Sequence, residues 1–308
     1  MKSGHVVLLV LAIAGIMVAS IMVGAVALSP GAVLHGLIDP DAPAGVIVRR
    51  LRVPRVLLGF LVGGSLGISG AALQALIRNP LADPFLLGLS GGAGLGAVIA
   101  IAFGIGGAWA IPLMAFGGAL LAIGLVYRLG VVSGGRLDPR ILLLAGVVTG
   151  AFASSLMSAI IVLSDADRLR NAFLWLLGGL GAASWQSVTI FAVYAIFPVG
   201  IILYHARALD LLVLGEDTAR HLGADTERTK RVIYTATALL TAAGVAVCGI
   251  IGFIGLVVPH AVRQLGGPLH RGLLPLSFIG GGTFLVLADA LARTVVRPVE
   301  LPVGIVTA

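Results

Sequence analysis

The sequence predicts an all-α, polytopic membrane protein, and two observations lead to this class. Of 308 residues, 59% are hydrophobic and 11% are charged, whereas a soluble domain carries roughly 25% charged residues. Uncharged runs such as residues 6–28 are long enough for a spanning helix, which needs about 20 apolar residues. These runs do not alternate in polarity as the strands of a transmembrane β-barrel do, so the sequence favours a helical bundle.

Nine crossings are expected where charged residues or Pro- and Gly-rich segments separate the apolar runs. They fall near residues 6–28, 56–77, 86–106, 109–129, 141–163, 186–206, 232–249, 250–265 and 273–296. A tenth is expected to begin at Leu301 and to be truncated at Ala308. Residues 1–308 are therefore expected to form one transmembrane domain. Its N-terminus is placed in the cytoplasm, because that orientation puts more basic residues inside.

The net charge of +7 does not indicate a nucleic-acid-binding protein, because the basic residues are scattered over predicted loops and form no run. Cys248 is the only cysteine, which excludes an intrachain disulfide, and its apolar surroundings predict a small buried side chain. We expect no metal site, since no His-rich loop or carboxylate cluster accompanies the candidate ligand His260.

Glycines recur at spacings that suit helix packing. Residues 59, 63 and 67 in the second crossing are four apart, and small residues at this spacing let helices approach closely in lipid. A denser cluster comprises Gly88, Gly91, Gly92, Gly94 and Gly96. Packing is one interpretation of this cluster, and the other is helix bending or close approach to a passing substrate.

The chain carries no motif for nucleotide hydrolysis. A phosphate-binding loop needs a lysine in G-x-x-x-x-G-K-[ST], and Lys2 and Lys230, the only lysines, lie in no such motif. Residues 88–92 do match G-x-S-x-G, the nucleophile elbow. An intramembrane serine hydrolase built on Ser90 and His260 is therefore an alternative, although the elbow needs a strand before the serine and a helix is expected here.

A proton-coupled carrier is a further alternative, and it would place carboxylates deep in several helices. The predicted crossings lack such a set. Asp289 lies four residues before Arg293, so the two share one helix face and can pair, which lowers the cost of either charge at membrane depth.

The longest internal hydrophilic segment spans about residues 209–231. Glu216 and Asp217 suit the first turn of a helix, Glu216 and Arg220 are spaced i,i+4, and Gly223 suits a C-terminal cap. The pattern predicts a short amphipathic helix, a turn at Gly223 and a second short helix leading into the seventh crossing. Its mixed charge favours docking in a protein groove over lying on a bilayer.

Four blocks together resemble the permeases of ATP-binding-cassette (ABC) importers for iron chelates, haem and vitamin B12. The blocks are LRVPRVLLGFLVGGSLGISGAALQALIRNPLADPFLLGLSGGAGLGA (51–97), LGEDTARHLGAD (214–225), GFIGLVVPHAVRQLGGPLHRGLLPLS (252–277) and ADALARTVVRPVELPVGIVTA (288–308). The resemblance implies ten helices per subunit and a homodimer in the bacterial inner membrane. It also implies two cytosolic ATPase subunits, which bind ATP and Mg, and a periplasmic or lipid-anchored binding protein. No cofactor and no enzymatic activity are expected in this chain.

The resemblance also assigns roles to individual residues. Binding-protein docking falls on Arg52, Arg55 and Arg293, and the cytoplasmic gate on Asn79, Leu81, Asp138 and Pro139. ATPase coupling falls on Leu214, Gly215, Glu216, Ala219, Arg220, Leu222 and Gly223. Residues 168–180 resemble a short external half-helix beside the cavity, where Arg170 and Trp175 are candidates to touch substrate or to anchor at the membrane interface. Gly88, Ser90 and Gly92 of the glycine-rich segment are the other candidates for the substrate pathway. Ferric siderophore, haem and corrinoid permeases share these blocks, which therefore do not distinguish the cargo.

Overall fold

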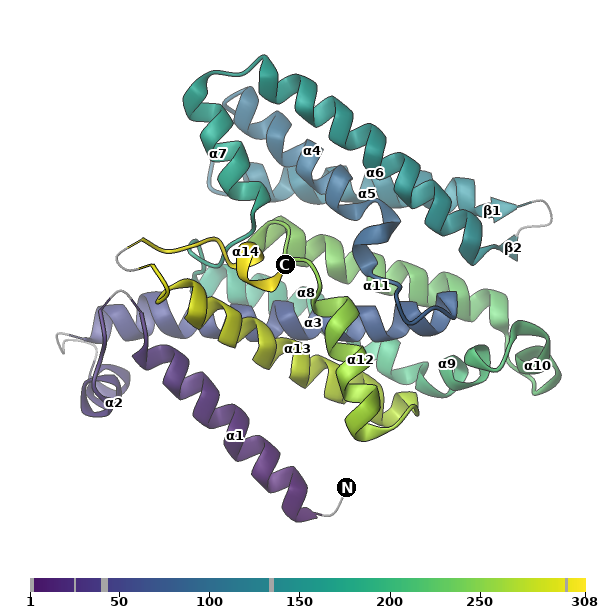
Figure 1. The fold of residues 1–308 in the computed structure, drawn as a ribbon, viewed down its shortest axis with the longest axis horizontal. Helices are drawn as coiled ribbons and strands as arrows, with labels where there is room; N and C mark the ends of the chain where they lie inside the picture. Colours follow the sequence, from purple (N-terminus) through teal and green to yellow (C-terminus); the bar gives the residue numbers. More distant parts are fainter. Residues whose placement is uncertain (1–2, 25, 40–43, 133–135, 297–298) are drawn as a thin grey trace.

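A computed structural model describes residues 3–24, 26–39, 44–132, 136–296 and 299–308 as a helical bundle (Figure 1). The longer helices are α1 (Ser3–Met22), α3 (Val53–Ile77), α4 (Leu89–Ala102), α5 (Ala110–Gly130), α6 (Pro139–Val162), α8 (Trp185–Tyr204), α11 (Thr226–Cys248), α12 (Ile254–Gly266) and α13 (His270–Ala292). The shorter ones are α2 (Pro30–Ile38), α7 (Ala166–Leu176), α9 (Ala206–Val213), α10 (Glu216–His221) and α14 (Val303–Thr307). A π-helical turn, η1 (Ile47–Arg52), leads into α3, and a 3-10 turn, η2 (Pro84–Leu87), precedes α4. The strands β1 (Val131–Val132) and β2 (Arg136–Leu137) form a small antiparallel ladder between α5 and α6.

Six described segments are long and apolar enough to cross a membrane: 47–77, 110–130, 139–162, 185–204, 226–248 and 270–292. They confirm six of the predicted crossings, and α1 occupies the first. Helices α4 and α12 occupy the predicted crossings at 86–106 and 250–265, but they are shorter than predicted, with 14 and 13 residues. At 1.5 Å per residue these helices measure about 20 Å, which is less than the roughly 30 Å hydrocarbon core.

Residues in the left-handed backbone conformation explain why α4 and α12 are short. Gly88 has a φ of 76° immediately before α4, and Gly249 and Phe253 have φ values of 69° and 67° before α12. An α-helix cannot continue through such residues. The hydropathy of the sequence does not reveal where positive φ values interrupt a helix.

Helix α3 is the centre of the bundle, with α13, α11, α12 and α8 packed around it. Its glycines permit the approach, as the four-residue spacing predicts. A methyl group on Gly67 would lie 2.2 Å from the Ser277 carbonyl oxygen of α13, and one on Gly70 would lie 1.9 Å from the Gly255 carbonyl oxygen of α12. At these positions α3 meets the backbones of both neighbouring helices.

Gly67→Ala is therefore expected to destabilise the protein, since overpacking a close contact costs about 1–3 kcal/mol. The matched control is Gly15→Ala in α1, where nothing lies within 4 Å of the added methyl group. Thermal unfolding of the two variants in detergent would test this. An apparent melting temperature for Gly67→Ala as high as that of Gly15→Ala would contradict the packing.

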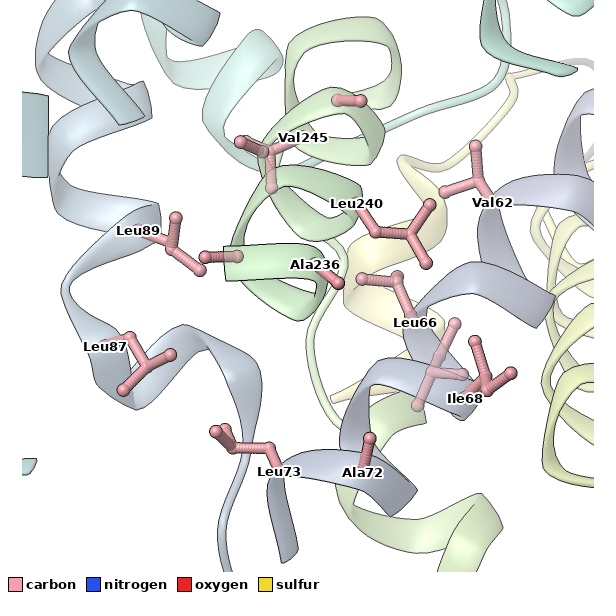
Figure 2. Close-up of a cluster of buried hydrophobic side chains, with 14 of the residues drawn as sticks. Val62, Leu66, Ile68, Ala72, Leu73, Leu87, Leu89, Ala236, Leu240 and Val245 are labelled. Carbon is pink, nitrogen blue, oxygen red and sulfur yellow. The ribbon is translucent and has the colours of Figure 1, made fainter. Parts of the chain in front are cut away.

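A second group of helices, α4 to α6, packs beside this centre, and α11 contacts both groups. Figure 2 shows the junction: Leu89 of α4 lies beside one face of α11, and Leu240 on another face of α11 lies toward Val62 and Leu66 of α3. Buried side chains of both groups form one hydrophobic cluster, and close van der Waals packing holds such helices together in lipid. In Figure 1 the ladder β1–β2, α9 and α10 lie at one end of the bundle and α2 lies at the other.

Candidate functional site

A polar pocket of about 770 Å³ lies at the end of the bundle that carries β2 and α10. We call it the inner pocket. It is lined by Ile77, Arg78, residues 136–140, Glu216, Asp217, Arg220, Glu227 and Lys230. The structure thereby brings together two groups that lie about 80 residues apart in the sequence: Asp138 and Pro139 of the predicted gate, and Glu216 and Arg220 of the predicted coupling segment.

The coupling segment has the predicted turn but a different helix arrangement. Arg220 Nη2 lies 3.3 Å from Glu216 Oε2, which confirms the i,i+4 pair. The N–H groups of Gly223 and Ala224 donate to the carbonyls of Arg220 and Ala219, an arrangement that caps α10 as predicted. The separate second short helix was a wrong prediction: after the turn, the chain enters α11 directly at Thr226.

Other coupling residues divide between the surface and the core. The Ala219 side chain is fully buried, whereas Leu214 and Leu222 are 63% and 59% exposed. Gly215 precedes α10 with a φ of 115°, a conformation that favours glycine. The extra helix α9 was not predicted, although its apolar face, which includes Leu209 and Leu212, packs into the core.

The NPLADP loop is fixed by its own polar side chains. Arg78 ends α3 with a φ of 57°, and Asn79 Oδ1 accepts a hydrogen bond of 2.9 Å from the Leu81 N–H. Asp83 Oδ1 accepts one of 2.8 Å from the Phe85 N–H, and burial raises the pKa of the Asp83 carboxyl above its usual range. The Leu81 side chain is 69% exposed, which leaves it free to contact a partner or a second copy.

Asp138 is the N-cap of α6. Its Oδ1 accepts a hydrogen bond of 2.8 Å from the Arg140 N–H, and Pro139 occupies the first turn, where proline is favoured. The Asp-Pro pair therefore caps the helix as a hydroxyl residue would. Asn79 lies outside the inner pocket and lines a neighbouring pocket of about 250 Å³, with Arg78 lining both.

Asp138→Ala is expected to lower the stability of the protein by about 1 kcal/mol, since it removes the side-chain acceptor of this cap. Asp138→Asn is the matched control, because asparagine caps helices about as well as aspartate. Thermal unfolding in detergent measures both. Equal losses for Ala and Asn would show that capping is not what position 138 contributes.

The three predicted docking arginines lie together at the other end of the bundle, and two of them, Arg55 and Arg293, pair with Asp289. Arg55 Nη2 and Arg293 Nε each lie 2.9 Å from a different oxygen of Asp289, and Arg55 Nη1 lies 2.7 Å from Glu300 Oε2. The Asp289–Arg293 pair was predicted, but Arg55 and Glu300 as partners were not. Arg52, Arg55, Arg293 and Glu300 line a pocket of about 380 Å³, which we call the outer pocket.

Arg52 and Arg293 also hold the end of α1. Arg52 Nη1 donates to the Ile21 carbonyl oxygen at 2.6 Å, and Arg293 Nη1 donates to that of Val23 at 2.7 Å. Cations at a helix C-terminus satisfy free carbonyls and favour the helix dipole. Both arginines are buried, at 7% and 3% exposed, so the crowding of arginines at this end has a structural cause that sequence reasoning missed.

Of the predicted pathway residues, Gly92 lines a pocket of about 690 Å³ between α4, α5 and α6. Gly92 packs on α5, where a methyl group would lie 2.5 Å from the Gly118 carbonyl oxygen, and Gly88 packs on α6. These contacts favour the packing interpretation of both glycines. Arg170 is exposed on α7, and Trp175 is half-buried against the core. A role for any of these residues in a substrate pathway stays a prediction.

The hydrolase alternative lacks its structural context. Ser90 lies half-buried in the first turn of α4, and the 3-10 turn η2 precedes it where a nucleophile elbow needs a strand. His260 Nε2 lies 3.0 Å from Gln264 Nε2 on its own helix. Within the described ranges, no three His, Cys, Asp or Glu side chains are grouped to hold a metal ion. Cys248 is buried, as predicted.

Comparison with known proteins agrees with the four sequence blocks. Residues 9–308 match the FecCD transport family. The chain is 43% identical over 265 residues to the cobalamin import system permease protein BtuC of Halobacterium salinarum, covering 86% of this chain and 71% of that protein. It is 42% identical over 263 residues to the hemin transport system permease protein HmuU of Yersinia pestis, covering 83% and 78%.

A solved structure is similar along almost the whole chain. It is an inward-facing conformation of a metal-chelate type ABC transporter, with a TM-score of 0.87 and 30% sequence identity, and the match covers 97% of this chain and 93% of the other. The family match, the relatives and the six apolar spans agree with one another. The chain belongs to the FecCD transport family and is a multi-pass membrane permease of an ABC importer.

Proposed function

We propose that the chain is one of two identical permease subunits that move a metal chelate from the periplasm to the cytoplasm across a bacterial inner membrane. The cargo is a ferric siderophore, haem or a corrinoid, classes supported by relatives whose names specify cobalamin and hemin. Two cytosolic ATPase subunits bind ATP and Mg and supply the energy. A periplasmic or lipid-anchored binding protein delivers the cargo.

The inner pocket is the observation that carries this proposal. An importer driven by a separate ATPase needs a contact for that ATPase close to a gate, so that closure of one can act on the other. Here α10 and the start of α6 line the same pocket. Leu214 and Leu222 project beside α10 with most of their surface exposed. Exposed apolar side chains flanking a charged helix suit insertion into a groove of the ATPase.

The outer pocket suits the binding protein. Arg52, Arg55 and Arg293 face a common cavity, and Glu300 is their 40% exposed acidic neighbour. A carboxylate from a binding protein would enter this cavity and compete with Glu300 for Arg55. Charge complementarity of this kind favours fast and specific association.

Joint reconstitution of the chain with its ATPase and binding protein in liposomes tests the proposal. Uptake of labelled cyanocobalamin, hemin and a ferric siderophore is measured with ATP and with a non-hydrolysable ATP analogue. We expect ATP-dependent uptake of one cargo class, the class that the binding protein binds. An assembled complex that takes up none of the three would contradict the proposal.

Ser90→Ala provides a further expected result in the same assay. Because Ser90 lies in the helical start of α4 rather than at an elbow, removal of its hydroxyl should leave ATP-driven uptake unchanged. A hydrolase built on Ser90 would instead lose its activity in this variant. Hydrolysis of ester substrates by the purified chain, abolished by Ser90→Ala, would contradict the permease assignment.

A further inference from the structure

The Lys230 side chain lies on α11 and joins this helix to α10, which precedes it, and to β2, 93 positions away in the sequence. Its Nζ lies 2.7 Å from the Leu137 carbonyl oxygen in β2, 3.0 Å from Glu216 Oε2 in α10 and 2.7 Å from Glu227 Oε1 in α11. Only 2% of the side chain is exposed. A buried charge without partners is costly, so the ammonium group is constrained to stay with these acceptors.

Leu137 is held by α11 through both of its backbone groups. Its carbonyl oxygen accepts the bond from Lys230, and its N–H donates to Glu227 Oε2 at 3.0 Å. Its side chain is 1% exposed. The next residue, Asp138, caps α6. The start of α6 therefore cannot move away from α11 without breaking these bonds.

Glu216 links the same ammonium group to the coupling segment. It is the first residue of α10, and Arg220 Nη2 lies 3.3 Å from its Oε2. We call Glu216, Arg220, Glu227, Lys230 and the backbone of Leu137 the Lys230 junction. It contains two cations and two anions, so its members can shift together and leave no net charge unpaired.

We propose that the Lys230 junction transmits movement: when the ATPase displaces α10, the junction moves β2 and the start of α6 with it. This rests on the proposed function, because the displacement comes from the ATPase. Lys230 is a positioning residue in this scheme, because its ammonium group contacts Leu137, Glu216 and Glu227 and acts through them. The ammonium group donates hydrogen bonds to the Leu137 carbonyl oxygen and the Glu216 carboxylate, and it forms an ion pair with Glu227.

A fluorescent reporter at the end of β2 can follow the transmitted movement. Cys248 is the only native cysteine and is buried, so Arg136→Cys introduces a single exposed thiol for labelling. The label is read in the assembled complex in nanodiscs, with and without a non-hydrolysable ATP analogue and Mg. We expect a nucleotide-dependent change when Lys230 is present.

Lys230→Met is expected to retain the ATPase and its hydrolysis of ATP but to weaken the nucleotide response of the label and the uptake per ATP. Coupling between two sites is typically about 5- to 150-fold, and we expect a loss in that range. Lys230→Arg should restore part of the response. The matched control is Arg228→Met, which removes an exposed cation two residues away on the same helix.

A neutral variant separates coupling from folding. Lys230→Met leaves the two carboxylates with Arg220 as their common cation, whereas Glu227→Gln/Lys230→Met removes one charge of each sign and keeps the Glu216–Arg220 pair. If the assembled neutral variant keeps the label response and the uptake per ATP of the wild type, the proposed coupling role of the Lys230 junction is wrong. Failure of every Lys230 variant to assemble would also count against it, because the junction would then serve folding. Absence of ATP-driven uptake by the wild type would instead overturn the proposed function.

Discussion

Asp289→Asn is expected to destabilise the protein by about 3–5 kcal/mol, the usual cost of removing one partner from a buried ion pair. The Asp289 carboxylate is 2% exposed and contacts the guanidinium groups of Arg55 and Arg293, whose side chains are 13% and 2% exposed. The substitution leaves both cations buried beside a neutral amide. Arg293 also holds the end of α1, so we expect that helix to detach first.

The matched control for this prediction is Glu300→Gln. Glu300 is 40% exposed and forms an ion pair with Arg55, and exposed pairs contribute about 0–1 kcal/mol. The apparent melting temperature in detergent, and limited proteolysis of the segment between α1 and α2, measure both variants. Equal stability of Asp289→Asn and Glu300→Gln would contradict a central role for the Asp289 carboxylate.

Joint replacement of Glu216 with Gly and Arg220 with Pro is expected to abolish transport. Proline inside a helix removes a backbone donor and clashes with the preceding turn, which costs about 3 kcal/mol or more, and α10 has only six residues. The change also removes the Glu216–Arg220 pair. We expect the ATPase to be lost on purification, in contrast to Lys230→Met, which should retain it.

Asp217→Ala is the control within the same helix, because the Asp217 side chain is 90% exposed and makes one ion pair of 3.5 Å. Copurification of the ATPase and its stimulation by loaded binding protein are compared in proteoliposomes. A Glu216→Gly/Arg220→Pro complex with wild-type stimulation would show that α10 does not carry the coupling.

Features that depend on local spacing were predictable from the sequence. The Glu216–Arg220 and Asp289–Arg293 pairs follow from the four-residue period of a helix, and the cap at Gly223 follows from the backbone freedom of glycine. The close approach of α3 to its neighbours likewise follows from glycines four residues apart. Each of these inferences needs only residues within one or two helical turns.

Contacts between distant segments were not predictable in this way. Arg52 meets the end of α1 across 31 positions, Arg293 meets it across 270, and Lys230 meets Leu137 across 93. In each case the acceptor is a backbone carbonyl, which every residue has, so residue type carries no signal. The sequence resemblance therefore led to an expectation that the outer arginines meet a binding protein, which stays a prediction, and it carried no signal of the helix that they hold.

The central claim is that this chain transports cargo only when a partner hydrolyses ATP. Measuring which energy source drives uptake tests it most directly. Proteoliposomes containing the chain, its ATPase and its binding protein are loaded with ATP and Mg, and uptake of the cargo that the binding protein retains is measured with no ion gradient. A second set contains the chain alone with an imposed pH gradient. The account predicts uptake in the first set and none in the second. Uptake by the chain alone, driven by the pH gradient, would contradict it and would assign the chain to the proton-coupled carriers.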